Sequence, residues 1–220
     1  MTAQAQVQIG LQVATKAEAV YQELRSRILD GSIKPASTLN QEALAATLGL
    51  SITPLREALR RLESEGLVRL TAHRTMTIAP LTRRELHELY AVRLALDPFA
   101  AALTAEQADD ETLAEIEQLA RRRVNRSPRA LLQHNRSFHH AIYSSCGNLV
   151  LIGVLDQLWN RTDRYRLIVL QNRIQERAAE EEHREIAAAL LGRDASRVAD
   201  LVHRHVEKTQ RLIEQLAEEL

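Results

Sequence analysis

Residues 40–78 read NQEALAATLGLSITPLREALRRLESEGLVRLTAHRTMTI, and this stretch decides the fold of the N-terminal part of the chain. Asn40 is a good N-cap, and Leu44 and Leu48 follow it at helical spacing. Gly49 then supplies the left-handed residue that commonly ends a short helix. The pattern predicts one short helix that ends at Gly49.

A second helix is expected to start almost at once. Thr53 can cap it, and Pro54 suits its first position because the N–H that proline lacks would have no partner there. Its outer face carries Arg56, Arg60 and Arg61, and its apolar stripe consists of Leu55, Ala58, Leu59 and Leu62. Two short helices joined by Gly-Leu-Ser-Ile are typical of a helix-turn-helix DNA reader, although an ordinary αα-corner fits the pair alone.

The sequence period changes from 3.6 to 2 after Gly66, which should end the second helix. Two short runs of alternating apolar residues follow, and they contain Val68, Leu70, Met76 and Ile78. Residues 72–74 lie between the runs as a turn that includes Arg74. This pattern predicts a β-hairpin wing with a basic tip, which favours the DNA reader over the αα-corner.

The stretch LGLSITPLREALRRLESEGLV at residues 48–68 resembles the winged helix-turn-helix motif of GntR-type bacterial transcription regulators. The resemblance covers about residues 16–80 and implies binding to double-stranded operator DNA. It departs from the family at Ile52, where Arg is usual, and at Thr75, where Gly is usual. The DNA contacts that it implies are Ser51, Thr53 and Arg56 in the recognition helix and Arg74 in the wing.

The composition fits a mainly helical protein with two domains. The chain has 220 residues, 45% of them hydrophobic, and only seven Gly and five Pro. We expect a flexible tail at residues 1–15, a winged helix-turn-helix domain at 16–80 and an all-α domain at 83–215.

The chain carries no sequence feature of a membrane or secreted protein. No stretch approaches the roughly 20 consecutive apolar residues that span a bilayer, and the N-terminus lacks the pattern of a signal peptide. The single Cys146 excludes an internal disulfide. We therefore expect a cytoplasmic protein with no membrane partner.

The net charge of 0 requires that any DNA-binding charge be placed locally. Residues 16–80 hold nine Lys/Arg and seven Asp/Glu, a balance of +2, and residues 81–220 hold twenty and twenty-two, a balance of −2. DNA binding would depend on the placement of Arg56, Arg60, Arg69 and Arg74 and on doubling this patch in a homodimer, because phosphate contacts dominate affinity.

The second domain is expected to be an all-α bundle of six helices. Thr82 and Glu85 form a capping box at the head of a long helix, which Pro98 should kink or interrupt. The other helices are expected at about residues 110–124, 128–145, 149–170, 173–191 and from 194 onward. No strand pattern occurs after residue 80.

Three histidines on three of these helices share a face with apolar residues. They are His139, His183 and His205, and Asn135 lies one turn before His139 on the same face. A lone inward His is more often a hydrogen-bonded core residue, but three together with an amide oxygen favour a divalent cation such as Zn²⁺ or Ni²⁺. Such a ligand set leaves coordination positions open, which suggests either chemistry or ligand sensing.

The second domain also resembles a known family. The spacing of Asn135, His139, His183 and His205, with YAVRLALDP at 90–98 and FHHAIYSSCGN at 138–148, looks like the FCD effector domain of FadR-type GntR regulators. The resemblance covers about residues 83–215. It implies a divalent metal held by Asp or Asn and three His, with a small organic acid bound beside it. Asn135 and Asp97 stand where Asp and Glu, respectively, are commoner.

Arg93 lies in phase with the apolar residues of the first helix of this domain and should point inward. An inward Arg needs a partner, which is either the carboxylate of an effector or Asp97 at i+4. The runs Arg121–Arg123 and Glu180–Glu182 are expected to be solvated faces.

These features predict a ligand-responsive homodimeric transcription regulator, a repressor that binds an inverted repeat and is not an enzyme. One alternative is a metal-dependent hydrolase built on the histidines, but the chain lacks a motif such as H-E-x-x-H, and the DNA reader would be unexplained. Another is an architectural DNA-binding protein with a structural metal.

Overall fold

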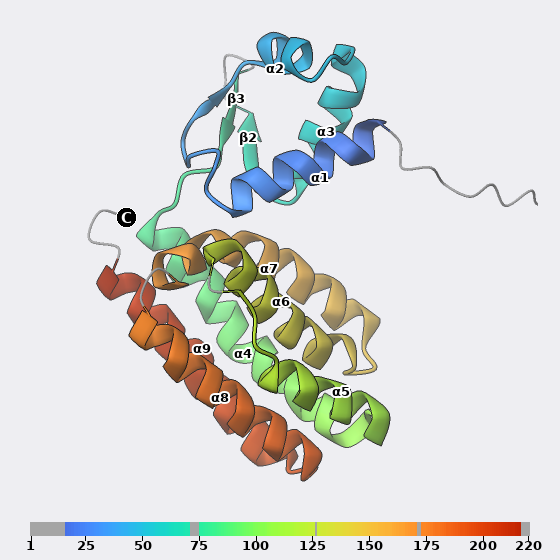
Figure 1. Cartoon of the computed structure of the whole chain (residues 1–220), viewed down its shortest axis with the longest axis vertical. Coiled ribbons are helices and arrows are strands. Elements are labelled where there is room, and N and C mark those ends of the chain that lie inside the picture. Colours follow the sequence, from blue (N-terminus) through green and yellow to red (C-terminus); the bar gives the residue numbers. More distant parts are fainter. Residues whose placement is uncertain (1–15, 71–74, 126, 171–172, 217–220) are drawn as a thin grey trace, which may run out of the picture.

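The computed structural model describes residues 16–70, 75–125, 127–170 and 173–216. The described residues form three hydrophobic clusters, one centred on an N-terminal group of elements and two within a C-terminal group. The chain passes from one group to the other after Ile78 (Figure 1). The predicted tail at 1–15 and Arg74 in the wing turn lie outside the described residues. No helix in the described ranges is long and apolar enough to cross a bilayer.

The N-terminal group is a winged helix-turn-helix, as predicted. It contains α1 (Lys16–Leu29), β1 (Thr38–Leu39), α2 (Gln41–Thr47), α3 (Ile52–Ser64), β2 (Val68–Leu70) and β3 (Met76–Ile78). The antiparallel sheet has the strand order β1-β3-β2, and Val68 pairs with Ile78 across the wing. The apolar residues predicted for α3 are buried against α1.

The start of α3 differs from the prediction. Asn40 does cap α2, since its side chain accepts a hydrogen bond from the Ala43 N–H at 3.0 Å, and Gly49 has a positive φ of 64°. However, α3 begins at Ile52 with Ser51 as its N-cap, so Thr53 is not the cap and Pro54 is not in the first position. Pro54 still lies in the first turn, where its missing N–H leaves no helical hydrogen bond unmade.

The C-terminal group confirms the all-α prediction, with six helices among the described residues. They are α4 (Arg83–Gln107), α5 (Asp110–Arg121), α6 (Pro128–Ser144), α7 (Leu149–Leu170), α8 (Arg173–Leu191) and α9 (Ala195–Leu216). Thr82 caps α4 by accepting from the Glu85 N–H at 3.1 Å. The helix continues through Pro98, so the predicted interruption is wrong. One missing hydrogen bond is outweighed by the buried side chains on both sides of Pro98, including Tyr90 and Ala101.

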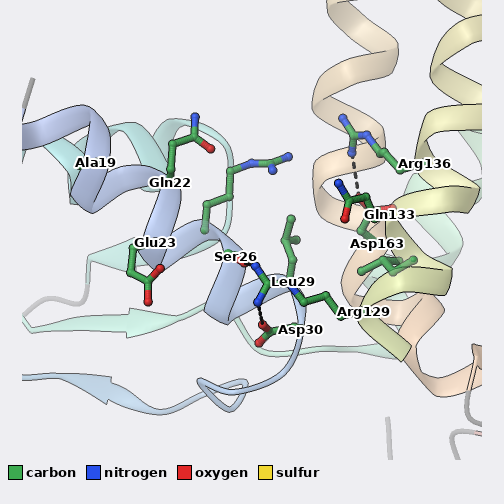
Figure 2. A pocket seen from close by; sticks show the side chains of 12 residues that line it. Ala19, Gln22, Glu23, Ser26, Leu29, Asp30, Arg129, Gln133, Arg136 and Asp163 are labelled. Carbon is green, nitrogen blue, oxygen red and sulfur yellow. Dashed lines mark hydrogen bonds and ion pairs between the residues drawn. The ribbon is translucent and has the colours of Figure 1, made fainter. Parts of the chain in front are cut away.

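The winged domain packs directly on α6 and α7 (Figure 1). Leu132 of α6 belongs to the hydrophobic cluster of the winged domain. Arg129 of α6 donates a hydrogen bond to the Ser26 hydroxyl at 2.8 Å, and Arg25 of α1 donates to the Asn160 side chain of α7. A cleft lies between α1 and α6 beside these contacts (Figure 2), and its volume is about 490 Å³. The two domains are thus held together by both apolar and polar contacts.

Candidate functional site

The outer face of α3 is a candidate nucleic-acid interface. Ser51, Thr53, Arg56 and Arg60 are all exposed there, opposite the buried stripe of the helix. The Arg56 Nε lies 3.4 Å from the Gln41 side-chain oxygen of α2, an exposed contact that DNA can replace. The helix therefore presents hydroxyl and guanidinium donors to solvent, and such donors bind phosphates and base edges.

A second candidate site lies inside the helical bundle. His139 of α6, His183 of α8 and His205 of α9 are buried, and one nitrogen from each ring lies within 4.8 Å of the others. The His139 Nε2 and His183 Nε2 atoms are 3.2 Å apart. In contrast, His140 of α6 and His203 of α9 are exposed. The structure therefore brings together the three histidines that the sequence singled out.

Burial keeps the clustered imidazoles in the neutral form that binds metals. Desolvation lowers the pKa of His139 and of His183 well below the ordinary value, and their neighbouring imidazoles and Arg166 add to this effect. Desolvation also lowers the pKa of His205, although its hydrogen bond to Glu182 acts in the opposite direction. The cluster can therefore offer lone pairs at neutral pH.

One nitrogen of the cluster has a lone pair that a metal could accept. The His205 Nδ1 lies 2.6 Å from the Glu182 Oε2, whereas the His205 Nε2 is buried and has no hydrogen-bond partner in the described part of the chain. Glu182 is half-buried and also binds Lys208. The prediction of a solvated face is therefore wrong for Glu182, because α9 packs over it.

Asn135 is buried one turn before His139, as predicted, but its oxygen already has one partner. The Asn135 Oδ1 accepts a hydrogen bond from Arg166 Nη2 at 2.7 Å, and the Asn135 Nδ2 has no partner among the described residues. A carbonyl oxygen has two lone pairs, so this bond leaves one for a metal. Coordination by Asn135 remains a prediction.

Arg93 points inward and has the intrahelical partner considered from the sequence. Its Nε and Nη2 atoms donate to the Asp97 Oδ2 at 3.1 and 2.5 Å, and its guanidinium carbon lies 3.9 Å from the centre of a Trp159 ring. Desolvation opposes the charge of Arg93, but attraction by Asp97, Tyr90 and Asp163 and the hydrogen bond to Asp97 together outweigh it and raise the pKa of Arg93. Arg93 stays charged in the interior beside the histidines.

Sequence reasoning missed the guanidinium of Arg166 on α7, which is buried close enough to His139 and His183 to lower their pKa values. No carboxylate lies within ion-pair distance of it in the described ranges, and desolvation lowers its pKa. Its spacing of seven residues from the buried Trp159 was a helical signal that could have revealed it. An interior cation with no acid partner is a place where an anion can bind.

Several other buried polar atoms around the two arginines also lack partners within the described ranges. A native interior normally satisfies such atoms, so a concentration of them indicates a site that a ligand or water completes. Besides the His205 and Asn135 atoms, they are Tyr90 Oη, Asp97 Oδ1, Trp159 Nε1 and Asp163 Oδ1. The arrangement is suited to holding a divalent metal together with a small anion.

Comparison with known proteins identifies the family of each domain. The sequence profile of the bacterial regulatory proteins of the gntR family matches residues 16–78, and that of the FCD domain matches residues 88–208. BphR of Paraburkholderia xenovorans, named an uncharacterized HTH-type transcriptional regulator, is 30% identical over 90% of this chain and 85% of its own. The HTH-type transcriptional repressor GlaR of Escherichia coli is 26% identical over 84% of this chain and 90% of its own. The solved structure of E. coli McbR/YncC has a TM-score of 0.76 at 26% identity and covers 91% of this chain and 98% of its own.

The lowered pKa values predict how stability depends on pH in the metal-free protein. In the unfolded chain the imidazoles take up protons near pH 6.5, whereas the buried ones stay neutral, so the unfolded state binds more protons below that pH. The free energy of unfolding should fall by about 1.4 kcal/mol per pH unit for each such imidazole below pH 6.5. Urea denaturation with a chelator present, at pH 7, 6 and 5, measures this slope.

The matched controls are His183→Asn and His203→Asn. The first should make the slope shallower, and the second, at an exposed position, should leave it as in the parent. Equal slopes for the two variants would show that burial of His183 is not a source of the pH dependence.

Proposed function

Because the chain belongs to the GntR family of bacterial regulatory proteins and carries an FCD domain, we propose that it is a repressor that acts in the cytoplasm. Binding of a small carboxylate would release it from its operator DNA. In this proposal residues 16–80 read DNA, and residues 83–215 bind the effector and form a homodimer. The observation that carries it is the buried cluster of histidines and arginines in a bundle that directly contacts the DNA-reading domain. The relative GlaR, named as a repressor, supports the direction of regulation.

The proposed operator is an inverted repeat. One recognition helix covers only a half-site, so two copies related by a two-fold axis would bind two half-sites. Ser51, Thr53, Arg56 and Arg60 are exposed on α3 for this role, and Arg74 would contribute from the wing. A guanidinium such as that of Arg56 can bind a guanine edge through two hydrogen bonds.

Exposed apolar side chains on α4 and α7 support the homodimer. Phe99 is 52% exposed and Val92 43% on α4, and Val150 is 79% exposed on α7. The helices α4 and α7 pack against each other, so these side chains lie on neighbouring elements. A second copy of the chain would remove this surface from water.

The proposed effector site combines a metal with a buried cation. His139, His183 and His205 would hold a divalent transition metal, Zn²⁺ or Ni²⁺, and Asn135 would add an oxygen ligand. When bound, such an ion acts as a Lewis acid that attracts the carboxylate of a ligand. Arg93 is the predicted second contact for that carboxylate, and to bind it Arg93 would share its donors with Asp97.

The helices α6 and α7 provide a route from this site to the DNA-reading domain. On α6, His139 faces the cluster, and Leu132 belongs to the core of the winged domain. On α7, Arg166 binds Asn135, and Arg164 donates a hydrogen bond to the Ala79 carbonyl at the end of the winged domain. A ligand that prefers one arrangement of these helices would change the position of the recognition helices.

The metal-dependent hydrolase and the architectural DNA-binding protein are less well supported. The relatives carry the names of transcriptional regulators, and the buried unpaired polar atoms favour a binding site for a ligand over a purely structural metal. Turnover of a substrate panel would favour the hydrolase. DNA affinity that does not respond to any organic acid would favour the architectural protein.

Arg56→Ala should weaken operator binding by roughly 1 to 3 kcal/mol, because it removes a bidentate base contact. The measurement is a gel-shift titration on an inverted-repeat operator and on an isolated half-site, which also tests binding as a dimer. Arg121→Ala is the matched control, since it removes one exposed charge from α5, far along the chain from α3. If the Arg56 and Arg121 variants bind equally well, Arg56 is not a DNA contact.

The purified protein should contain about one divalent transition metal per chain. His183→Ala should lower this occupancy because it removes a buried nitrogen of the cluster, and His203→Ala should not, because His203 is exposed on α9. Elemental analysis of the two variants after equal exposure to Zn²⁺ or Ni²⁺ makes the comparison. Equal occupancy in both would exclude His183 as a ligand.

His139→Ala should leave operator affinity largely intact but abolish its response to the effector. The mutation removes a metal ligand and leaves α3 unchanged, so only the coupling between the sites is lost. Organic acids that raise the melting temperature of the metal-loaded parent are then added to gel-shift titrations of both proteins. A variant that responds like the parent would mean that the signal does not pass through this metal site.

A further inference from the structure

We propose that Glu182 of α8 is a positioning residue that aims His205 at the metal. Its carboxylate holds the His205 ring by Nδ1, so that Nε2 is the nitrogen presented to His139 and His183. This inference rests on the metal site proposed above, and it assigns a role to a residue outside the ligand set.

The geometry leaves His205 one nitrogen for a metal. The Glu182 Oε2 lies 2.6 Å from His205 Nδ1, and a carboxylate can only accept, so Nδ1 carries the hydrogen. The His205 side chain is 1% exposed, and its Nε2 has no hydrogen-bond partner in the described part of the chain. The centre of the His205 ring lies 5.0 Å from that of His139 and 4.9 Å from that of His183. The Nε2 lone pair is therefore the one available inside the cluster.

An imidazole without such a partner can adopt several tautomers and ring orientations, and most of them do not suit a metal ligand. The neutral ring has two tautomers, and rotation about the bond to Cβ exchanges the places of its two edges. Only one combination directs a lone pair from Nε2 into the cluster. A carboxylate acceptor on Nδ1 selects that tautomer and also increases the basicity of the opposite nitrogen.

Glu182 is itself held in place by α9. Its Oε1 accepts a hydrogen bond from the Lys208 Nζ, so both carboxylate oxygens have partners on the helix that carries His205. Glu182 and His205 also line a cleft of about 390 Å³ between α8 and α9. The contact joins two helices at the edge of the buried cluster, where water reaches Glu182 but not the His205 ring.

The first test uses the full-length metal-free protein. Long-range ¹H–¹⁵N spectra of the histidine rings should show His205 with the hydrogen on Nδ1 in the parent. Glu182→Ala should give a mixture of tautomers, and Glu182→Gln should keep the parental form because its amide oxygen can also accept the N–H. Glu181→Ala, at the exposed neighbouring position, is the control and should match the parent. A parental tautomer in Glu182→Ala would overturn the proposal.

The second test measures Zn²⁺ and Ni²⁺ affinity by competition with a chromophoric chelator. Loss of a hydrogen bond behind a metal ligand typically costs about 10- to 100-fold in affinity, so Glu182→Ala should show a loss of that size and Glu182→Gln a smaller one. Lys208→Met removes the ion pair between α8 and α9 but keeps the Glu182 contact, so its loss should also be smaller.

Each outcome of the second test has one meaning. If Lys208→Met loses as much metal affinity as Glu182→Ala, the effect comes from the ion pair between α8 and α9, and the positioning role is overturned. Parental affinity in Glu182→Ala would also overturn it. A parent that binds neither metal would instead overturn the metal site itself, and the tautomer spectra would still decide whether Glu182 orients His205.

Discussion

The cost of burying polar side chains is the constraint around which the helical bundle is built. Guanidiniums, imidazoles and carboxylates lie in its interior, where each charge or hydrogen-bonding atom needs a partner. Arg93 has Asp97 and the face of Trp159, and Arg166 has the Asn135 oxygen. These contacts leave several polar atoms of the bundle without partners among the described residues, including the His205 Nε2, the Asn135 Nδ2 and the Asp97 Oδ1. An interior with several unsatisfied polar atoms is suited to binding a ligand rather than to stability alone.

Helix α7 connects this interior to the start of α4. The Trp159 ring of α7 lies beside the cluster, with its centre 4.7 Å from that of His139. Arg161, also on α7, donates a hydrogen bond to Glu85 at the start of α4, at 2.5 Å. The Tyr165 hydroxyl lies in the same region and hydrogen-bonds both Glu85 and the Thr82 carbonyl. The segment that leads from the wing to α4 is therefore held by α7. A shift of α7 relative to α4 would move the attachment point of the DNA-reading domain.

The winged domain is stabilised by a core of apolar side chains. Its core is formed by apolar residues of α1 and α3 and the sheet, and its outer face is polar. Gly66, with a positive φ of 73°, turns the chain from α3 into the wing. The Arg161 side chain packs close by, since its Cδ would lie 3.2 Å from a Cβ at Gly66. The contact between the domains thus reaches the turn that directly follows the recognition helix.

The sequence by itself determined the helix-turn-helix, the wing, the six C-terminal helices and the inward direction of the three histidines. Capping residues, glycines and apolar periodicity are local signals, and helical phase fixes which side of a helix a residue occupies. Apart from the pair of Arg93 and Asp97 within α4, the tertiary structure alone decided which partners the inward residues meet. Glu182 reaches His205, and Arg166 reaches Asn135, because separate helices bring them together. The two-residue β1 also depends on a distant neighbour, since it is too short for a periodic pattern and forms only by pairing with β3. Contacts between separate elements are set by packing, and a single sequence records packing only indirectly.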